Sequence, residues 1–235
     1  SVSRKKAFDT ARKFPVVYLL HGYTGDYSDW MSMIPVERYA EKYGFAIVMP
    51  HGYNSWYMNI PHGPQVETYI AEELPAAMEA LLPVSEKASE RFIAGLSMGG
   101  TGAVHTALVY PDQYRAAASA SGVFSKDAFH KQYRNGTPEE LEAIDSMDFA
   151  WQGRPDILEL YRIRLSSGEH IPEHLCLYGT EDDMLPFQYR QLGDIVRKYN
   201  APVQMRCRSG GHDFKFWDSA IQEMLQWFSS FGESF

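Results

Sequence analysis

The sequence has few cysteines, a shortage of positive charge and no long apolar run, and each shortage excludes a class of protein. Only Cys176 and Cys207 occur among 235 residues, too few for a small disulfide scaffold. Two buried free thiols are favoured, and a pair on neighbouring strands is the alternative. Lys and Arg number 22 against 30 Asp and Glu, and the net charge of −8 opposes binding to nucleic acid or acidic membranes. No apolar stretch reaches the roughly twenty residues of a membrane span, so a soluble protein is expected.

Motifs for cofactors and metals are also missing. Neither G-x-x-x-x-G-K nor G-x-G-x-x-G opens a strand-to-helix unit, and His51 and His62 lack the spacing of metal ligands on a helix. We therefore expect no cofactor and no metal. The N-terminus, Ser1 to Lys6, lacks both the apolar core of a signal peptide and an initiator methionine. A cytoplasmic location is favoured, and a secreted protein stays open if a signal was removed upstream.

The apolar runs have the length of strands and alternate with helix-like segments. Phe14 to Gly22 is a continuous apolar run that ends in glycine, as expected for a strand covered on both faces. Helical spacing follows at 30–43 and at 66–82, where Pro75 predicts a kink or a restart. The predicted strands are 14–22, 45–50, 91–96, 114–123, 174–179 and 203–208, with an amphipathic helix after the last. This alternation predicts an α/β fold, with a mostly parallel sheet of six strands and helices on both faces.

The stretch 125–172 interrupts the alternation. It has nearly fifty residues, with charged and aromatic side chains and no clear strand. We interpret it as a cap or lid inserted into a single domain that spans 1–235.

Ser97 is the strongest candidate for a reactive residue. It ends an apolar strand and begins a helix of small residues, with Gly95 and Gly99 on either side. A strand that turns this sharply into a helix leaves no room for a Cβ at the two glycines, and it exposes the serine hydroxyl above the sheet. Ser97 is therefore predicted to be a nucleophile. An ordinary helix-capping serine is the alternative.

A serine nucleophile needs a base to accept its proton and an acid to orient that base. At the carboxyl ends of the last two predicted strands lie Thr180-Glu181-Asp182-Asp183 and Ser209-Gly210-Gly211-His212-Asp213. The order Ser97, Asp182, His212 is the order that an α/β-hydrolase requires. His212 is the predicted base and Asp182 the preferred acid, with Asp183 next.

Two further loops should lie at the same edge. Acyl transfer needs donors for an oxyanion, and the backbone amides of Tyr23 and Met98 are assigned to this role. His21 is expected to have a structural role. Trp56 and Tyr57 are candidate substrate-binding residues that could equally pack the loop onto the body.

Several of these motifs together resemble the esterase D-like branch of the α/β-hydrolases, in particular the bacterial tributyrin esterases. The resemblance extends over about residues 15–230, and its motifs are Tyr18-Leu-Leu-His-Gly22, Glu72-Glu-Leu-Pro75, Phe92-Ile-Ala-Gly-Leu-Ser-Met-Gly-Gly100, and Gly211-His212 followed by Phe214, Phe216 and Trp217. It implies hydrolysis of short-chain acyl esters without a cofactor, with some members acting on acetylated or feruloylated plant sugars. The family's N-terminal strands are largely missing here.

The leading hypothesis is a serine carboxylesterase that acts on a small-molecule ester, without a nucleic acid or membrane partner. A thioesterase like the S-formylglutathione hydrolases, or an acyltransferase to sugars, would use the same fold. A binding module on a hydrolase scaffold is the non-enzymatic alternative. The sequence leaves the ester and a homo-oligomeric state open.

Overall fold

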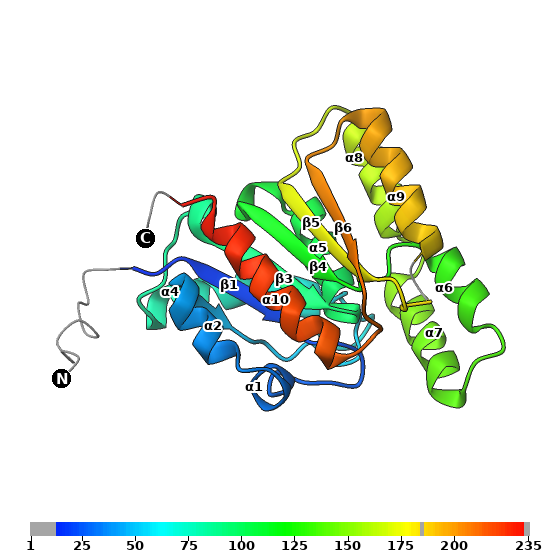
Figure 1. The fold of residues 1–235 in the computed structure, drawn as a ribbon, viewed down its shortest axis with the longest axis horizontal. Coiled ribbons are helices and arrows are strands. Elements are labelled where there is room, and N and C mark those ends of the chain that lie inside the picture. The colour runs from blue at the N-terminus through cyan, green and yellow to red at the C-terminus, as the bar shows by residue number, and fades with distance from the viewer. Residues whose placement is uncertain (1–12, 184–185, 233–235) are drawn as a thin grey trace.

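The protein is built on one six-stranded sheet in which every pair of neighbouring strands is parallel. The computed structural model describes residues 13–183 and 186–232, so the N-terminal stretch Ser1 to Lys6 discussed above lies outside it. The strand order is β2-β1-β3-β4-β5-β6 (Figure 1). The strands are β1 (Val16–Leu20), β2 (Ala46–Val48), β3 (Arg91–Leu96), β4 (Ala116–Ala120), β5 (Glu173–Gly179) and β6 (Val203–Arg208). The predicted α/β fold with six parallel strands is confirmed.

Helices cover both faces of the sheet because alternate side chains of its strands enter two separate hydrophobic clusters. In β1, Val17 and Leu19 belong to one cluster, and Val16, Tyr18 and Leu20 belong to the other. The first face carries α1 (Asp29–Met33), α2 (Val36–Tyr43) and α10 (Phe214–Ser229). The second carries α3 (Val66–Thr68), the π-helix Tyr69–Glu73, α4 (Leu74–Leu81), α5 (Met98–Val109), α8 (Ile157–Ser166) and α9 (Pro186–Tyr199). Short 3₁₀ turns occur at Ala88–Glu90 and Pro111–Gln113.

The predicted interruption at Pro75 takes the form of a π-helical stretch. Because proline has no backbone N–H, a carbonyl in the preceding turn loses its helical donor. The Tyr114 hydroxyl donates to the Ile70 carbonyl over 3.4 Å and supplies a replacement. The helix therefore continues through the proline with one wider turn.

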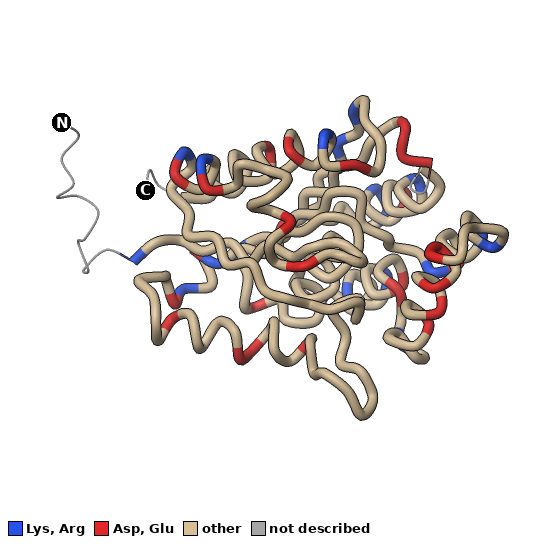
Figure 2. Tube along the Cα trace, turned by 90° about the horizontal axis from the view of Figure 1, so that it is seen from below, with Lys and Arg blue, Asp and Glu red and all other residues tan. Residues whose placement is uncertain are grey.

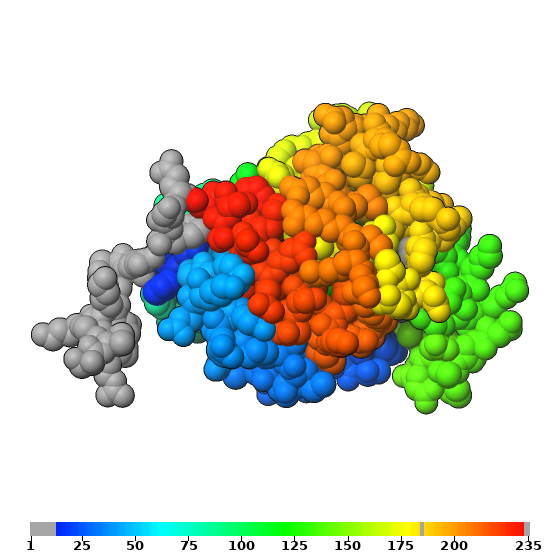
Figure 3. Space-filling model, in the orientation of Figure 1, coloured from blue at the N-terminus to red at the C-terminus, as the bar shows by residue number. Residues whose placement is uncertain are grey.

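The segment 125–172 contains α6 (Lys126–Tyr133), α7 (Pro138–Trp151) and α8. Figure 1 and the space-filling view in Figure 3 show α6 and α7 standing out at one end of the molecule. By contrast, α8 packs against α5 and α9. Only the first two helices therefore have the position expected of a cap, and their action as a lid stays a prediction.

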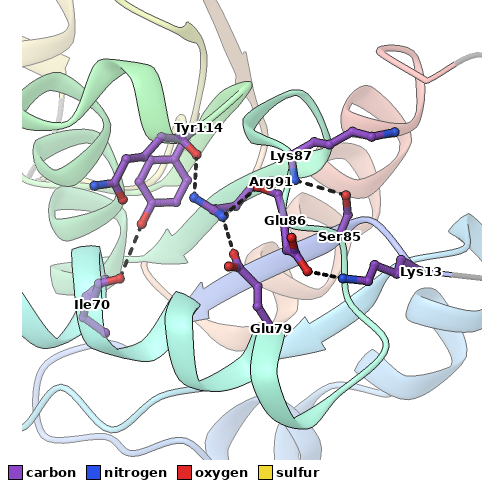
Figure 4. A network of polar contacts seen from close by, with 9 residues as sticks. Lys13, Ile70, Glu79, Ser85, Glu86, Lys87, Arg91 and Tyr114 are labelled. Carbon is purple, nitrogen blue, oxygen red and sulfur yellow. Dashed lines mark hydrogen bonds and ion pairs between the residues drawn. The ribbon is translucent and has the colours of Figure 1, made fainter.

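Arg91 organises the opposite end of the sheet, where the strands begin (Figure 4). Its guanidinium pairs with Glu79 and donates to the carbonyls of Glu86 at 3.2 Å and Gln113 at 3.3 Å. The contacts join α4, the 83–87 loop and the 3₁₀ turn before β4. The nearly buried guanidinium of Arg91 thus holds these three segments together.

Two smaller expectations meet different outcomes. Both cysteines are free, but only Cys176 is buried. Cys207 is exposed because it lies on the edge strand β6, so the prediction of two buried thiols is wrong for Cys207. Within the described residues, no helix is both long and apolar enough to cross a membrane. Figure 2 shows acidic positions spread over the surface, including the α6–α7 end.

Candidate active site

Ser97 occupies a strained turn between β3 and α5. Its φ of 50° and ψ of −121° lie outside the regions that non-glycine residues usually adopt. A Cβ at Gly95 would lie 2.4 Å from the Gly99 carbonyl carbon, and a Cβ at Gly99 would lie 2.3 Å from the Leu20 carbonyl oxygen. Both glycines are therefore required by close backbone approach, as the sequence predicted.

His212 lies between the hydroxyl of Ser97 and the carboxylate of Asp182. Its Nε2 is 2.9 Å from Ser97 Oγ, and its Nδ1 is 2.9 Å from Asp182 Oδ2. An ionised carboxylate only accepts hydrogen bonds, so Nδ1 carries the proton and Nε2 is left to accept from the serine. The Asp182 side chain is 1% exposed and the His212 side chain 27% exposed. The acid is therefore shielded from water while the imidazole edge can reach a substrate.

The three adjacent acids of the 180–183 loop have different positions. Asp182 is buried against His212, whereas Asp183 and Glu181 are exposed. The Glu181 carboxylate accepts from the Gly210 backbone N–H and, at 3.1 Å, from the Ser209 hydroxyl. Glu181 thus holds the loop that carries His212, a role that sequence reasoning missed. Its only signal was its place one residue before the acid.

The loop after β1 approaches Ser97 closely. A Cβ at Gly22 would lie 3.6 Å from Ser97 Cβ, so the chain at Gly22 and Tyr23 passes beside the nucleophile. The Met98 amide is one of the first N–H groups of α5, which have no partner inside the helix. Both backbone amides that we assign to an oxyanion hole therefore belong to segments that lie next to Ser97.

His21 fixes this loop. The Gly52 N–H donates to its Nε2 over 2.9 Å, so the ring proton lies on Nδ1, which is 2.7 Å from the Gly22 carbonyl oxygen. The ring is fully buried, and burial lowers the pKa of His21. These contacts agree with the expected structural role, since a neutral imidazole here joins the loops after β1 and β2.

A pocket of about 220 Å³ opens beside Ser97. Its other lining residues come from the loops after β1, β2 and β4 and from α6 and α7, and they are Tyr23, Thr24, Trp56, Val123, Phe129, Tyr133, Glu139, Glu140 and Ala143. Four of these nine residues are aromatic, and two are glutamates. Among the described residues, no three His, Cys, Asp or Glu side chains come together as a metal site.

Trp56 and Tyr57 differ in their positions. Trp56 lines the pocket and packs against Phe129 of α6. Tyr57 is fully buried, its hydroxyl donates to the His21 carbonyl over 3.1 Å, and a Cβ at Gly52 or Gly102 would collide with its ring. Of the two roles that the sequence left open for Tyr57, these contacts favour packing of the loop onto the body over substrate binding.

Asn54 connects the pocket loops to α7, and the sequence contained no signal for this contact. Its side-chain Oδ1 accepts from the Thr24 N–H at 2.8 Å, and its carbonyl accepts from the Ser146 hydroxyl at 2.8 Å. The loop after β1 is therefore braced from outside by Asn54, which is itself tied to the protruding helix α7.

A parallel sheet covered on both faces, with a strained serine turn after its third strand in the chain, defines the α/β-hydrolase class. The structure resembles FphF, a fluorophosphonate-binding serine hydrolase of Staphylococcus aureus, with a TM-score of 0.83 and 28% identity over 97% of this chain and 89% of that one. It also resembles the S-formylglutathione hydrolase FrmB of Staphylococcus aureus, with a TM-score of 0.80 and 29% identity over 93% of this chain and 85% of that one.

The chain belongs to the esterase family, since the family model described as "Putative esterase" matches residues 5–228. One relative is the acetyl esterase of Caldicellulosiruptor saccharolyticus. It is 28% identical over 229 residues, which cover 91% of this chain and 82% of that protein. The protein is therefore a serine hydrolase of carboxylic esters, as the sequence predicted.

Proposed function

We propose that this esterase hydrolyses short-chain acyl esters through an acyl-enzyme on Ser97, with His212 as the base and Asp182 as its orienting acid. The observation that carries the proposal is the chain of two 2.9 Å contacts from Ser97 Oγ through the imidazole to the buried carboxylate. A serine hydroxyl becomes nucleophilic when a neighbouring base accepts its proton, and the acid stabilises the resulting imidazolium.

The reaction has two steps. Ser97 Oγ attacks the ester carbonyl as His212 Nε2 takes the hydroxyl proton, and the amides of Tyr23 and Met98 donate to the oxyanion. The intermediate expels the alcohol, which receives the proton from His212. Water then attacks the acyl-enzyme, His212 accepts its proton, and the carboxylic acid leaves Ser97 with its hydroxyl restored.

The size of the pocket supports a small acyl group. A volume of about 220 Å³ beside Ser97 has room for an acetyl or butyryl chain. The acetyl esterase relative is named for a short acyl group, which agrees with this preference. The proposal is therefore an esterase for acetyl to butyryl esters.

The test is a panel of acetyl, butyryl, octanoyl and feruloyl p-nitrophenyl esters, run with the wild type and with Ser97→Ala. We expect kcat/KM for the two short esters to exceed that for octanoyl by at least about tenfold. Ser97→Ala should lose on the order of 10⁴-fold or more and should lose labelling by a fluorophosphonate, with an unchanged thermal midpoint. Unchanged turnover in the variant would remove Ser97 from the mechanism, and an octanoyl preference would remove the short-chain assignment.

Thioester hydrolysis is the second candidate, favoured by the likeness to FrmB. A thioester would use the same serine and histidine, so S-formylglutathione belongs in the same panel. A kcat/KM for S-formylglutathione above that of p-nitrophenyl acetate would replace the ester assignment. Release of the acyl group to an added sugar, rather than to water, would indicate a transferase.

A further inference from the structure

We propose that Glu139 and Glu140 make this pocket reject acyl groups that carry a negative charge. The inference rests on the proposed function, because it takes the pocket beside Ser97 as the acyl site. It assigns to the two glutamates a specificity role, the exclusion of half-esters of dicarboxylic acids, while neutral short acyl esters are accepted.

Within residues 13–183 and 186–232, the two glutamates are the only charged residues among those that line the pocket. They come from the first turn of α7, whose sequence Pro138-Glu-Glu-Leu-Glu-Ala-Ile-Asp-Ser-Met-Asp-Phe-Ala-Trp151 contains no Lys or Arg. No basic side chain therefore lines the pocket to pair with a substrate carboxylate. An incoming anion meets two like charges and no compensating one.

Both carboxylates are held where they stand. Glu140 Oε2 accepts from the Thr137 N–H at 2.6 Å, and the Thr137 hydroxyl accepts from the Glu140 N–H at 3.3 Å, which together form a capping box. Hydrogen bonds from its own backbone N–H and from the Thr137 hydroxyl lower the pKa of Glu139. The helix cap thus holds the Glu140 carboxylate, and both residues line the pocket that also contains Ser97, Glu139 from an exposed position and Glu140 from a half-buried one.

The pKa of Tyr133, which lines the pocket, depends in part on nearby acids. Its ring lines the pocket, and its pKa is raised to about 12, first by burial and then by the charges of Glu140, Asp182 and Asp183. Of these acids, Asp182 is engaged by His212. The phenol stays protonated and can donate to a neutral substrate oxygen.

The basic side chains of the neighbouring elements contact other groups. Lys126 Nζ donates to the Arg154 carbonyl at 3.1 Å, Arg154 pairs with Glu67, and Lys131 lies 5.9 Å from the centre of the Phe187 ring. His130 Nε2 is 2.9 Å from Asp148 Oδ1. These contacts engage the four side chains. Arg134, at the end of α6, is exposed and does not line the pocket, so the charge among the described lining residues is negative.

The test compares three p-nitrophenyl esters of similar length: valerate, hemiglutarate, and the methyl ester of hemiglutarate. We expect the wild type to hydrolyse hemiglutarate at least about tenfold less efficiently than its neutral methyl ester. Glu139→Gln with Glu140→Gln should raise kcat/KM for hemiglutarate about tenfold and leave the two neutral esters within about twofold. Glutamine also serves at the third position of a capping box, so the cap is retained, and thermal unfolding checks this.

The matched control is Glu37→Gln with Glu41→Gln on α2, which changes the net charge equally on the other face of the sheet. It should leave the hemiglutarate ratio unchanged, and added salt should shrink the wild-type discrimination. Equal rates for hemiglutarate and its methyl ester in the wild type would overturn the charge assignment while leaving the esterase intact. Discrimination that moves equally in the control pair would also overturn it.

The last comparison uses an ester whose negative charge lies on the alcohol rather than on the acyl group. A carboxylated phenyl butyrate should show less discrimination than hemiglutarate, because its charge lies on the leaving group. If only this arm responds to Glu139→Gln and Glu140→Gln, the glutamates face the alcohol, and the proposal as stated is wrong. Absence of turnover for all neutral esters would contradict the proposed function itself, a result distinct from either.

Discussion

The side of the sheet where the strands begin (the amino edge) and the side where they end (the carboxyl edge) use buried charge in different ways. At the amino edge, the Arg91 guanidinium is surrounded by Glu79 and two backbone carbonyls (Figure 4). At the carboxyl edge, the Asp182 carboxylate contacts one ring nitrogen of His212, and the other ring nitrogen contacts the Ser97 hydroxyl beside the pocket. The first arrangement pairs its charge with structural partners through the two terminal nitrogens of Arg91, while the second leaves a ring nitrogen of His212 to accept the proton of a reactive hydroxyl.

The backbone shows the same contrast. Ser97 adopts a φ of 50° in the turn at the carboxyl edge, where a Cβ at Gly99 would contact the Leu20 carbonyl. Arg91 begins an ordinary extended strand at the other edge. Strain kept only at one edge is typical of a site that needs a reactive group held in place. Substitutions at the two edges should therefore separate activity from stability.

The largest effect is expected from Asp182→Asn. The amide can donate to Nδ1 and so favours the wrong tautomer of His212, which should lower kcat by on the order of 10⁴-fold. The thermal midpoint should change little, because the two side chains have the same shape. Asp183→Asn is the matched control and should keep most of the activity; if it loses as much as Asp182→Asn, the orienting acid has been misassigned.

The next effect concerns pH and stability. Burial lowers the pKa of His174 at the start of β5 from 6.5 to about 3. Between these values the unfolded state binds more protons, so the free energy of unfolding falls as pH drops from 6.5 toward 3 and is flat above 6.5. The slope from this group is up to about 1.4 kcal/mol per pH unit.

Urea unfolding from pH 7 to 4.5 measures this slope. His174→Phe should lower this slope by the contribution of about one bound proton, up to about 1.4 kcal/mol per pH unit. The control is a substitution of the exposed His62, His62→Gln. An unchanged slope in His174→Phe would show that the buried imidazole does not titrate as described. Because His174 lies far from the site at the other edge, kcat/KM of the folded protein at pH 7 should stay unchanged in both variants.

Arg91→Met should cost about 2–3 kcal/mol, because it leaves the Glu79 carboxylate and two carbonyls without their donor. The melting temperature should fall by roughly 5–10 °C, with kcat unchanged for the folded fraction. Glu173→Gln removes an exposed pair with Arg115 at the same edge and should cost under about 0.5 kcal/mol. A loss of kcat in Arg91→Met below its melting range would break the distinction between the edges.

The smallest effect is expected at Asn54. Asn54→Ala removes the acceptor for the Thr24 N–H and should loosen the loop that carries the Tyr23 amide. We expect kcat to fall about tenfold with little change in KM, equivalent to about 1.4 kcal/mol of lost transition-state stabilisation. Asn54→Asp keeps the acceptor and should recover most of the loss; a change confined to KM would indicate substrate contact instead.

How well the sequence predicted a feature depended on how far apart in the chain the contacting residues lie. The six strands and the turn at Ser97 have local sequence patterns, so apolar runs and two glycines were enough to predict them, although the close approach at Gly99 comes from the distant Leu20 carbonyl. The chain order of the three residues at the carboxyl edge also follows from strand order. The exposure of Cys207 depends on which strand lies at the side of the sheet, and that expectation was wrong. The burial of Tyr57 depends on which loop covers its side chain, and the sequence had left its two roles open.

The sequence by itself determined the fold class, the parallel sheet and the edge where Ser97, Asp182 and His212 had to lie, because hydrophobic periodicity and strand ends are local properties. Only the tertiary structure decided that Asp182 rather than its neighbours meets the imidazole, that Glu181 and Asn54 brace the loops, and that two glutamates of α7 face the pocket. The hydrogen bonds among these contacts join residues 29 or 30 positions apart. Packing of the whole chain sets their distances, and no local pattern encodes it.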